Sequence, residues 1–140
     1  MLGRDSLDFS FSGIKTAVLY YCHGQDMKGT DKVDSLSEQQ IADIAASFQA
    51  AVIDVLVKKT QRAAKKIGVK TILLGGGVAA NNALREALQN MCDNSAPPKK
   101  IFIAPKQYCT DNAVMVASLA YHKYKAKLFA DLTLEPKASG

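Results

Sequence analysis

Two short segments carry residue types that can bind an anion or a metal ion. The first is the glycine triplet at 75–77, which Asn81 and Asn82 follow closely. Glycine lacks a Cβ atom, so its backbone can approach a ligand closely and can adopt positive φ. A helix that begins just beyond such a loop offers free N–H groups and a positive dipole end to phosphate. The segment predicts a phosphate-binding loop; the alternative is a tight strand-to-helix turn with a capping asparagine.

Comparison of residues 75–80 with two established phosphate-loop patterns limits the kinds of nucleotide that the loop could bind. The Walker pattern ends in Gly-Lys followed by Ser or Thr, whereas Val78 follows Gly77. Gly75, Gly77 and Ala80 match the spacing of the dinucleotide fingerprint. That fingerprint also requires an acid at the end of the next strand, and residues 103–106 contain none. The sequence therefore disfavours a nicotinamide cofactor.

The second segment contains Cys109 and Asp111. A carboxylate at the mouth of a phosphate crevice can ligate a metal ion. Thr110 or Asp111 is also in the position of a helix N-cap, which is the alternative interpretation. Cys109 is a weaker candidate nucleophile because no general base accompanies it. His23 and His122 stand far apart, so the sequence does not predict a self-contained metal site.

A strand–loop–helix–strand unit should position both segments. Val69–Leu74 is a continuous apolar, β-branched run that predicts a buried strand, and Lys100–Ala104 predicts a second strand. One helix joins them, which favours parallel pairing with a right-handed crossover. Since ligands bind beyond the carboxyl ends of parallel strands, Gly75–Asn82 and Tyr108–Asn112 should face one crevice.

Helices account for most of the remaining sequence. Ser37 and Gln40 form a capping-box pattern before an apolar periodicity that runs to about Ile67, where Gly68 suits the C′ position. Such a helix would be ~45 Å long, which allows a bend or break. A shorter helix is expected over Ile14–Tyr21.

Three further segments complete the expected elements. Asp8–Gly13 predicts a short strand or an extended segment, and His23–Ser35 predicts a loop. A last helix should begin at Thr110 or Asp111. With no internal repeat and no linker, the 140 residues predict a single α/β domain that is rich in helix.

Composition excludes several classes of protein. The chain is 48% hydrophobic and 22% charged, which is typical of a globular protein. No uninterrupted apolar run reaches the ~18–20 residues of a bilayer span, and the N-terminus does not have the pattern of a secretory signal. The three cysteines include no C-x-x-C pair, so the sequence does not predict a disulfide framework. We therefore expect a cytoplasmic protein without membrane contact. The net charge of +5 leaves two interpretations of its Lys- and Arg-rich helix ends: contact with nucleic acid, or complementation of helix dipoles.

Three segments together resemble the TsaD family of tRNA-modifying enzymes. They run Asp-Phe-Ser-Phe-Ser-Gly-Ile-Lys-Thr-Ala from Asp8, Gly-Gly-Val-Ala-Ala-Asn-x-x-Leu-Arg from Gly76, and Cys-Thr-Asp-Asn-Ala from Cys109. Their order and the helices that connect them also agree with the family. The resemblance covers nearly the whole chain and implies a partial RNase H-like fold of the actin, sugar kinase and heat-shock chaperone (ASKHA) type. Residues 1–140 would be one partial domain, the C-terminal half of a longer two-lobed protein, with Met1 internal to it.

The resemblance also implies an activity and a set of site residues. The activity is transfer of threonylcarbamoyl from threonylcarbamoyl-adenylate to the adenosine next to the tRNA anticodon. Asn81 would contact the nucleotide, with Gly75, Gly76 and Gly77 against it. Ser12 and Gly13 would line the same cleft, although the roles within Asp8–Gly13 are not defined by the resemblance, nor is a catalytic residue.

A metal ion and protein partners are implied in the same way. Asp111 would be one ligand of a divalent iron or zinc ion, whose histidine pair (H-x-x-x-H) belongs to an N-terminal half that this chain lacks. The accessory proteins TsaB and TsaE and the tRNA would be partners, the isolated half should be inactive, and its uncovered apolar surface should make it self-associate. Two other functions stay open: a metalloendopeptidase, which matches an older label of the family, and a non-catalytic nucleotide-binding module.

Overall fold

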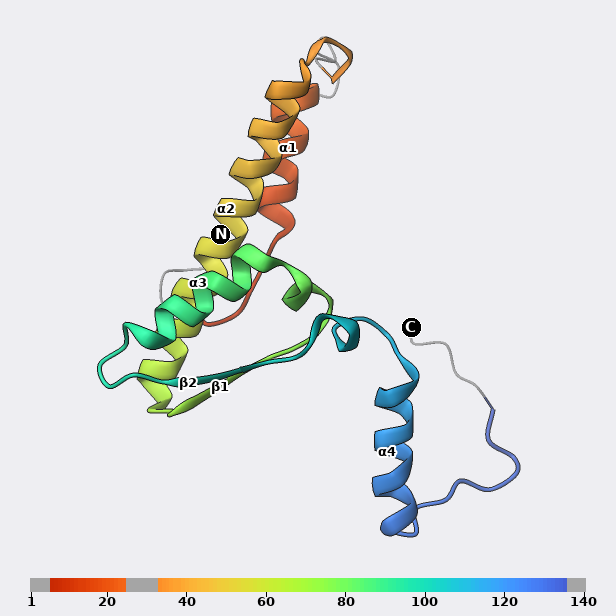
Figure 1. The fold of residues 1–140 in the computed structure, drawn as a ribbon. Coiled ribbons are helices and arrows are strands. Elements are labelled where there is room, and N and C mark those ends of the chain that lie inside the picture. The colour runs from red at the N-terminus through yellow and green to blue at the C-terminus, as the bar shows by residue number, and fades with distance from the viewer. Residues whose placement is uncertain (1–5, 25–32, 136–140) are drawn as a thin grey trace.

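The protein is represented by a computed structural model that describes residues 6–24 and 33–135. It is a helix-rich α/β arrangement in which α1 lies alongside α2, α3 lies between α2 and a small sheet, and α4 stands apart (Figure 1). The elements in chain order are α1 Ser12–His23, η1 Val33–Ser35, α2 Glu38–Ile67, β1 Thr71–Leu74, η2 Gly77–Ala80, α3 Asn82–Asp93, β2 Lys100–Ile103, η3 Lys106–Tyr108 and α4 Ala113–Lys125.

The sheet has two parallel strands, as the sequence predicted. β1 pairs with β2 from Thr71 opposite Lys100 to Leu74 opposite Ile103. β1 begins two residues later than the apolar run that starts at Val69. Because the strands run in the same direction, the glycine loop after β1 and the turn after β2 leave the same edge of the sheet (Figure 1).

The hydrophobic core lies under α3. Leu84, Leu88 and Met91 recur at helical spacing along α3, and they are buried together with Cys92. Partly buried residues of α2, β1 and β2 pack against this stripe: Ile53, Leu56, Val57, Ile72, Leu74 and Ile101. Each large apolar side chain buried in this way contributes roughly 1.5–3 kcal/mol. The core therefore holds α3, and the loop before it, in a defined position over the sheet.

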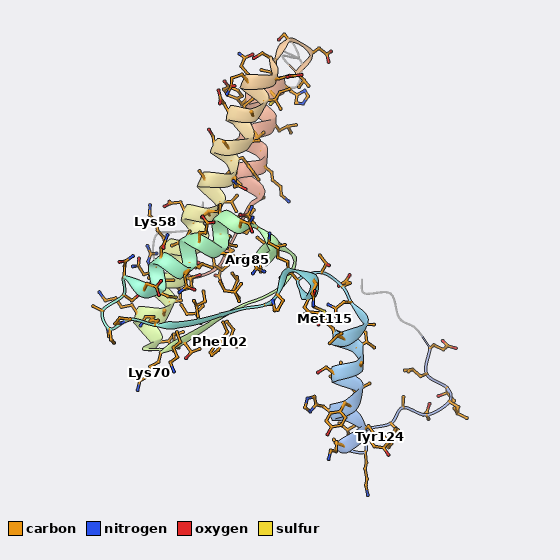
Figure 2. The ribbon with its side chains drawn as sticks, in the orientation of Figure 1. Lys58, Lys70, Arg85, Phe102, Met115 and Tyr124 are labelled. Carbon is orange, nitrogen blue, oxygen red and sulfur yellow. The ribbon has the colours of Figure 1, made fainter. Side chains whose placement is uncertain are left out.

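The opposite face of the sheet is open. Leu73 is 77% exposed and Phe102 is 63% exposed, and Figure 2 shows Phe102 on the side of the sheet away from α3. The expectation that Val69–Leu74 is a fully buried strand is therefore wrong for this chain. Alternate side chains of a strand face opposite ways, and the described residues supply a covering helix for one face only. We refer to Leu73 and Phe102 as the open sheet face.

α2 is a single helix of 30 residues, without the break that its length allowed. Its capping box is present: the Ser37 side chain accepts from the Gln40 N–H, and the Gln40 side chain accepts from the Ser37 N–H. Gly68 ends the helix at φ 76°, a left-handed conformation that favours glycine. Both helix boundaries agree with the sequence prediction.

The hydropathy of α2 also meets the length and composition criteria of a membrane span. An 18-residue window of this helix has a mean hydropathy of 1.5, although no uninterrupted apolar run of that length exists. One such helix is weak evidence for a span, since core helices of soluble proteins meet the same criteria. Here one side of α2 packs against α1 and α3, and Ala64 is its only fully buried residue among those described.

Three sequence expectations near the helix ends differ from the structure or extend beyond the described residues. α4 is capped by Asn112, whose Oδ1 accepts from the Met115 N–H at 3.2 Å, and not by Thr110 or Asp111. Residues 6–11 form neither a strand nor a helix, and α1 begins at Ser12, inside the Asp8–Gly13 segment and two residues before the predicted start at Ile14. Of the loop expected over His23–Ser35, residues 25–32 lie outside the described residues.

Candidate functional site

The glycine loop has one position that demands glycine and two that leave open space. Gly76 has φ 85°, which side chains of L residues rarely adopt. At Gly75 and Gly77 φ is ordinary, and an added Cβ would meet no atom within 4 Å. Two glycines that neither turn nor packing requires are consistent with a loop that a ligand approaches closely.

Asn81 caps α3 and still has hydrogen-bonding capacity for a ligand. Its Oδ1 accepts from the Leu84 N–H at 3.0 Å, and its Nδ2 donates to Gln49 Oε1 at 2.7 Å. An amide oxygen can accept twice and an amide nitrogen has two hydrogens. The capping interpretation of Asn81 is therefore confirmed, and with respect to the described residues one lone pair and one N–H remain for a ligand.

A cavity of about 560 Å³ lies beside Asn81, between α1, α2 and the start of α3. Its polar side chains are Lys15, Gln49 and Asn81, and aromatic rings come from Phe11 and Phe48. A pocket with aromatic walls and a few convergent polar groups, including one cation, suits a nucleotide-like ligand. The cavity joins the segment before α1 to the glycine-loop segment, which are more than 60 residues apart in the sequence.

The structure does not bring Ser12 and Gly13 to that cavity. They line a neighbouring hollow of about 350 Å³, on the side of α2 that carries Lys59. Lys59 donates to the Asp8 carbonyl and lies 5.8 Å from the centre of the Phe9 ring, so it fixes this segment against α2. Of the sequence-predicted residues, Asn81 thus lies in one cavity and Ser12 and Gly13 in another, with Phe11 bordering both.

Arg85 connects the loop after β1 to the turn after β2. Its Nε donates to the Ala79 carbonyl at 2.5 Å, and its Nη2 donates to the Ala104 carbonyl at 2.6 Å and to Cys109 Sγ at 3.2 Å. Figure 2 shows Arg85 between α3 and these connections. These contacts confirm that the two segments lie at the same edge of the sheet. The predicted shared crevice is not found among the described residues, because no residue of Tyr108–Asn112 lines the cavity beside Asn81.

Asp111 is an isolated surface carboxylate in the described part of the chain. It is exposed, it does not cap α4, and within the described residues its carboxylate has no hydrogen-bond or ion-pair partner. In the same part of the chain, no three His, Cys, Asp or Glu side chains gather as a metal centre requires. The role of Asp111 as a metal ligand stays a prediction. Cys109 is only 1% exposed, which does not suit a nucleophile.

Sequence reasoning assigned no role to Arg85, Lys15 or Gln49. Arg85 and Lys15 stand inside the segments that carry the resemblance, so a cation at those positions was the available signal. Gln49 gave no signal, because a glutamine on the polar side of a long helix is ordinary. Its contact with Asn81 spans 32 positions and depends on how α2 and α3 pack.

These features define a class of protein: an α/β domain with a glycine loop and an asparagine-capped helix at the carboxyl edge of a parallel sheet, as in nucleotide-binding proteins. Residues 2–118 match the family model of TsaD, tRNA N6-adenosine threonylcarbamoyltransferase. The chain belongs to this family.

Individual relatives agree with the family model. Proteins named tRNA N6-adenosine threonylcarbamoyltransferase from Lactobacillus delbrueckii subsp. bulgaricus and Thermosipho africanus are each 45% identical to this chain, over 99% and 96% of its length. The protein of that name from Desulfotalea psychrophila is 50% identical over 88% of the chain. The chain spans only 38% of the first two relatives and 34% of the third.

Proposed function

We propose that this chain is part of a tRNA N6-adenosine threonylcarbamoyltransferase. The protein would move the threonylcarbamoyl group from threonylcarbamoyl-adenylate to the adenosine next to the anticodon. The observation that carries the proposal is the family match over residues 2–118, which includes all three motif segments. The cavity beside Asn81 supports it, because two of these segments meet there.

The parallel sheet with its covering helix is compatible with half of an RNase H-like fold of the ASKHA type. In such a fold the chain would be a partial domain of the C-terminal half, and a second lobe would close the nucleotide cleft. The open sheet face supports this reading, since Leu73 and Phe102 would otherwise lie in water.

The chain's own residues would bind and orient the adenylate. The glycine loop and the amino end of α3 offer N–H groups to its phosphate, and Lys15 adds a positive charge at the cavity wall. The adenosine amine forms a bond to the carbonyl carbon, and the bond from that carbon to the phosphate oxygen breaks. AMP leaves with the electron pair, and the amine proton passes to solvent. Donors that hold the phosphate favour this step, because charge grows on the leaving oxygen.

Asp111 would contribute one anionic ligand to a divalent iron or zinc ion. When bound, such an ion polarises oxygen atoms and fixes the orientation of the donor. The partner-free carboxylate of Asp111 fits this role, and a histidine pair outside this chain would complete the site. One carboxylate holds such an ion weakly, so the isolated chain should be inactive.

The proposed partners follow from this activity. tRNA would be the acceptor, TsaB and TsaE would be accessory proteins, and the reaction would take place in the cytoplasm. The tRNA phosphates would contact the carboxyl end of α2, where Lys58, Arg62 and Lys65 border a surface hollow. Lys58 also pairs with Asp54 at 2.8 Å, so part of this charge is compensated.

A transfer assay with the full-length protein tests the proposal. Threonylcarbamoyl-adenylate and unmodified tRNA should give threonylcarbamoyladenosine, detected by mass spectrometry of the digested tRNA. A glycoprotein incubated in parallel tests the peptidase alternative, which no feature of the described residues favours. Cleavage of the glycoprotein without tRNA modification would refute the proposal, and nucleotide binding with neither reaction would favour a binding module.

A further inference from the structure

Arg85 closes a ring of hydrogen bonds around the glycine loop. The Ala104 N–H donates to the carbonyl of Leu74, the last residue of β1, at 2.9 Å. The Ala104 carbonyl accepts from Arg85 Nη2, and Arg85 Nε donates to the Ala79 carbonyl. The loop from Gly75 to Val78 is thus held at one end by the backbone bond between Ala104 and Leu74, and at the other end by the Arg85 guanidinium, which also binds the Ala104 carbonyl.

The same guanidinium reaches the turn that leads to Asp111. Its Nη2 contacts Cys109 Sγ at 3.2 Å, and Cys109 ends the short helix η3. Side chains of a helix lean toward its amino end, so Arg85, in the first turn of α3, lies over the segment that precedes its own helix. One residue therefore sets the spacing between Asn81, which caps α3, and the segment that carries Asp111.

Arg85 has no carboxylate partner among the described residues. Among the described residues its contacts are two backbone carbonyls and one thiol. A cation near the amino end of a helix is opposed by the helix dipole, so it is the hydrogen bonds to the loop and the turn that hold Arg85 in this place. Arginine suits three acceptors in different directions, because its donors form a rigid planar fork, whereas lysine presents a single ammonium group.

We propose that Arg85 is a positioning residue that holds the glycine loop and the Asp111 turn at the spacing needed to engage one nucleotide. This inference rests on the proposed function for its ligand, and on the hydrogen bonds for its geometry. Arg85 acts through Asn81, the glycine loop and Asp111, and it does not touch the reacting atoms.

A matched control residue lies at the other end of the same two strands. Lys99 is also a half-buried cation bonded to a backbone carbonyl, that of Val69, at 3.1 Å. Lys99→Met removes one cation–carbonyl contact and Arg85→Met removes two, together with the contact to Cys109, and both variants keep an unbranched side chain. Both should lower the melting temperature, but only Arg85→Met should loosen the site.

The first measurement is amide hydrogen exchange, which needs no ligand. Arg85→Met should accelerate exchange in the segments around the glycine loop and Cys109 at least tenfold relative to Lys99→Met. Equal exchange in both variants would overturn the positioning role. This result is independent of whether the protein modifies tRNA.

The second measurement is calorimetric binding of AMP to the full-length protein. Arg85→Met should lose at least tenfold in affinity, Lys99→Met less than twofold, and Arg85→Lys should regain melting temperature without regaining affinity. Full affinity in Arg85→Lys, or equal losses in the two Met variants, would overturn the inference. A parent protein that binds no AMP would refute the proposed nucleotide site, and the inference with it, even if the exchange result held.

Discussion

Substitution of Asn81 separates helix capping from nucleotide binding, because the structure shows which atoms serve the cap. Oδ1 accepts from the Leu84 N–H, and Nδ2 donates to Gln49. Asn81→Ala removes both contacts. Loss of the cap costs about 1 kcal/mol, and loss of an exposed side-chain hydrogen bond costs about 0.5–1 kcal/mol. Asn81→Ala should therefore lower the free energy of unfolding by roughly 1.5–2 kcal/mol, a large enough loss to blur any effect on binding.

Asn81→Asp is the sharper variant. Aspartate caps as well as asparagine, and its charge favours the amino end of α3 by about 0.3–1 kcal/mol. The Gln49 amide can turn to donate to the new carboxylate, so this contact need not be lost. The free energy of unfolding should therefore equal that of the parent or exceed it by up to about 1 kcal/mol. A negative charge beside a bound phosphate should nevertheless reduce AMP affinity at least tenfold, about 1.4 kcal/mol.

Urea denaturation and calorimetric titration with AMP, both on the full-length protein, measure the two quantities. Parental AMP affinity in Asn81→Asp would show that Asn81 is a cap only. An unchanged free energy of unfolding in Asn81→Ala would contradict the capping geometry itself. The reasoning stands only if the two variants separate, with Ala losing stability and Asp losing affinity.

Three further predictions follow from the same geometry. Asp111→Asn should melt within a few degrees of the parent, because Asp111 is exposed and does not cap α4. The full-length variant should nevertheless lose bound metal and transfer activity. Stoichiometric metal in the isolated chain, or full activity in the variant, would contradict this prediction. Gly77→Ala should leave the melting temperature unchanged or slightly higher, since nothing lies within 4 Å of the added Cβ, but it should weaken AMP binding. The matching variant Gly76→Ala should lower the melting temperature, because Gly76 has a positive φ. The isolated chain should self-associate through the open sheet face, and Phe102→Thr should shift light scattering toward monomer; a monomeric parent at high concentration would refute this.

Local patterns account for the elements that the sequence located correctly. A β-branched apolar run predicted β1, and the Ser37–Gln40 capping box with Gly68 predicted both ends of α2. The parallel pairing followed because one helix joins the strands, so their carboxyl ends had to meet at one edge. These inferences depend only on residues close together in sequence, which is why they succeeded.

The cap of α4 shows the limit of such local patterns. Thr110, Asp111 and Asn112 are all good capping residues and stand next to one another. Backbone conformation decides among them: Asn112 is extended, at φ −152° and ψ 156°, immediately before the helix. That conformation depends on how η3 and the turn after β2 pack, and it leaves the Asp111 carboxylate without a capping role.

The sequence by itself determined the order of the elements, the parallel sheet, and the place of the glycine loop and of Asp111 at one edge. It also determined the family, through three short segments with defined spacing. Only the tertiary structure decided which side chains join these segments. The contacts of Arg85 span 6, 19 and 24 positions, and side-chain contacts over such separations depend on the packing of α3 against the sheet. The exposure of Leu73 and Phe102 was likewise undecided by local sequence, since burial of a sheet face depends on whether another element covers it.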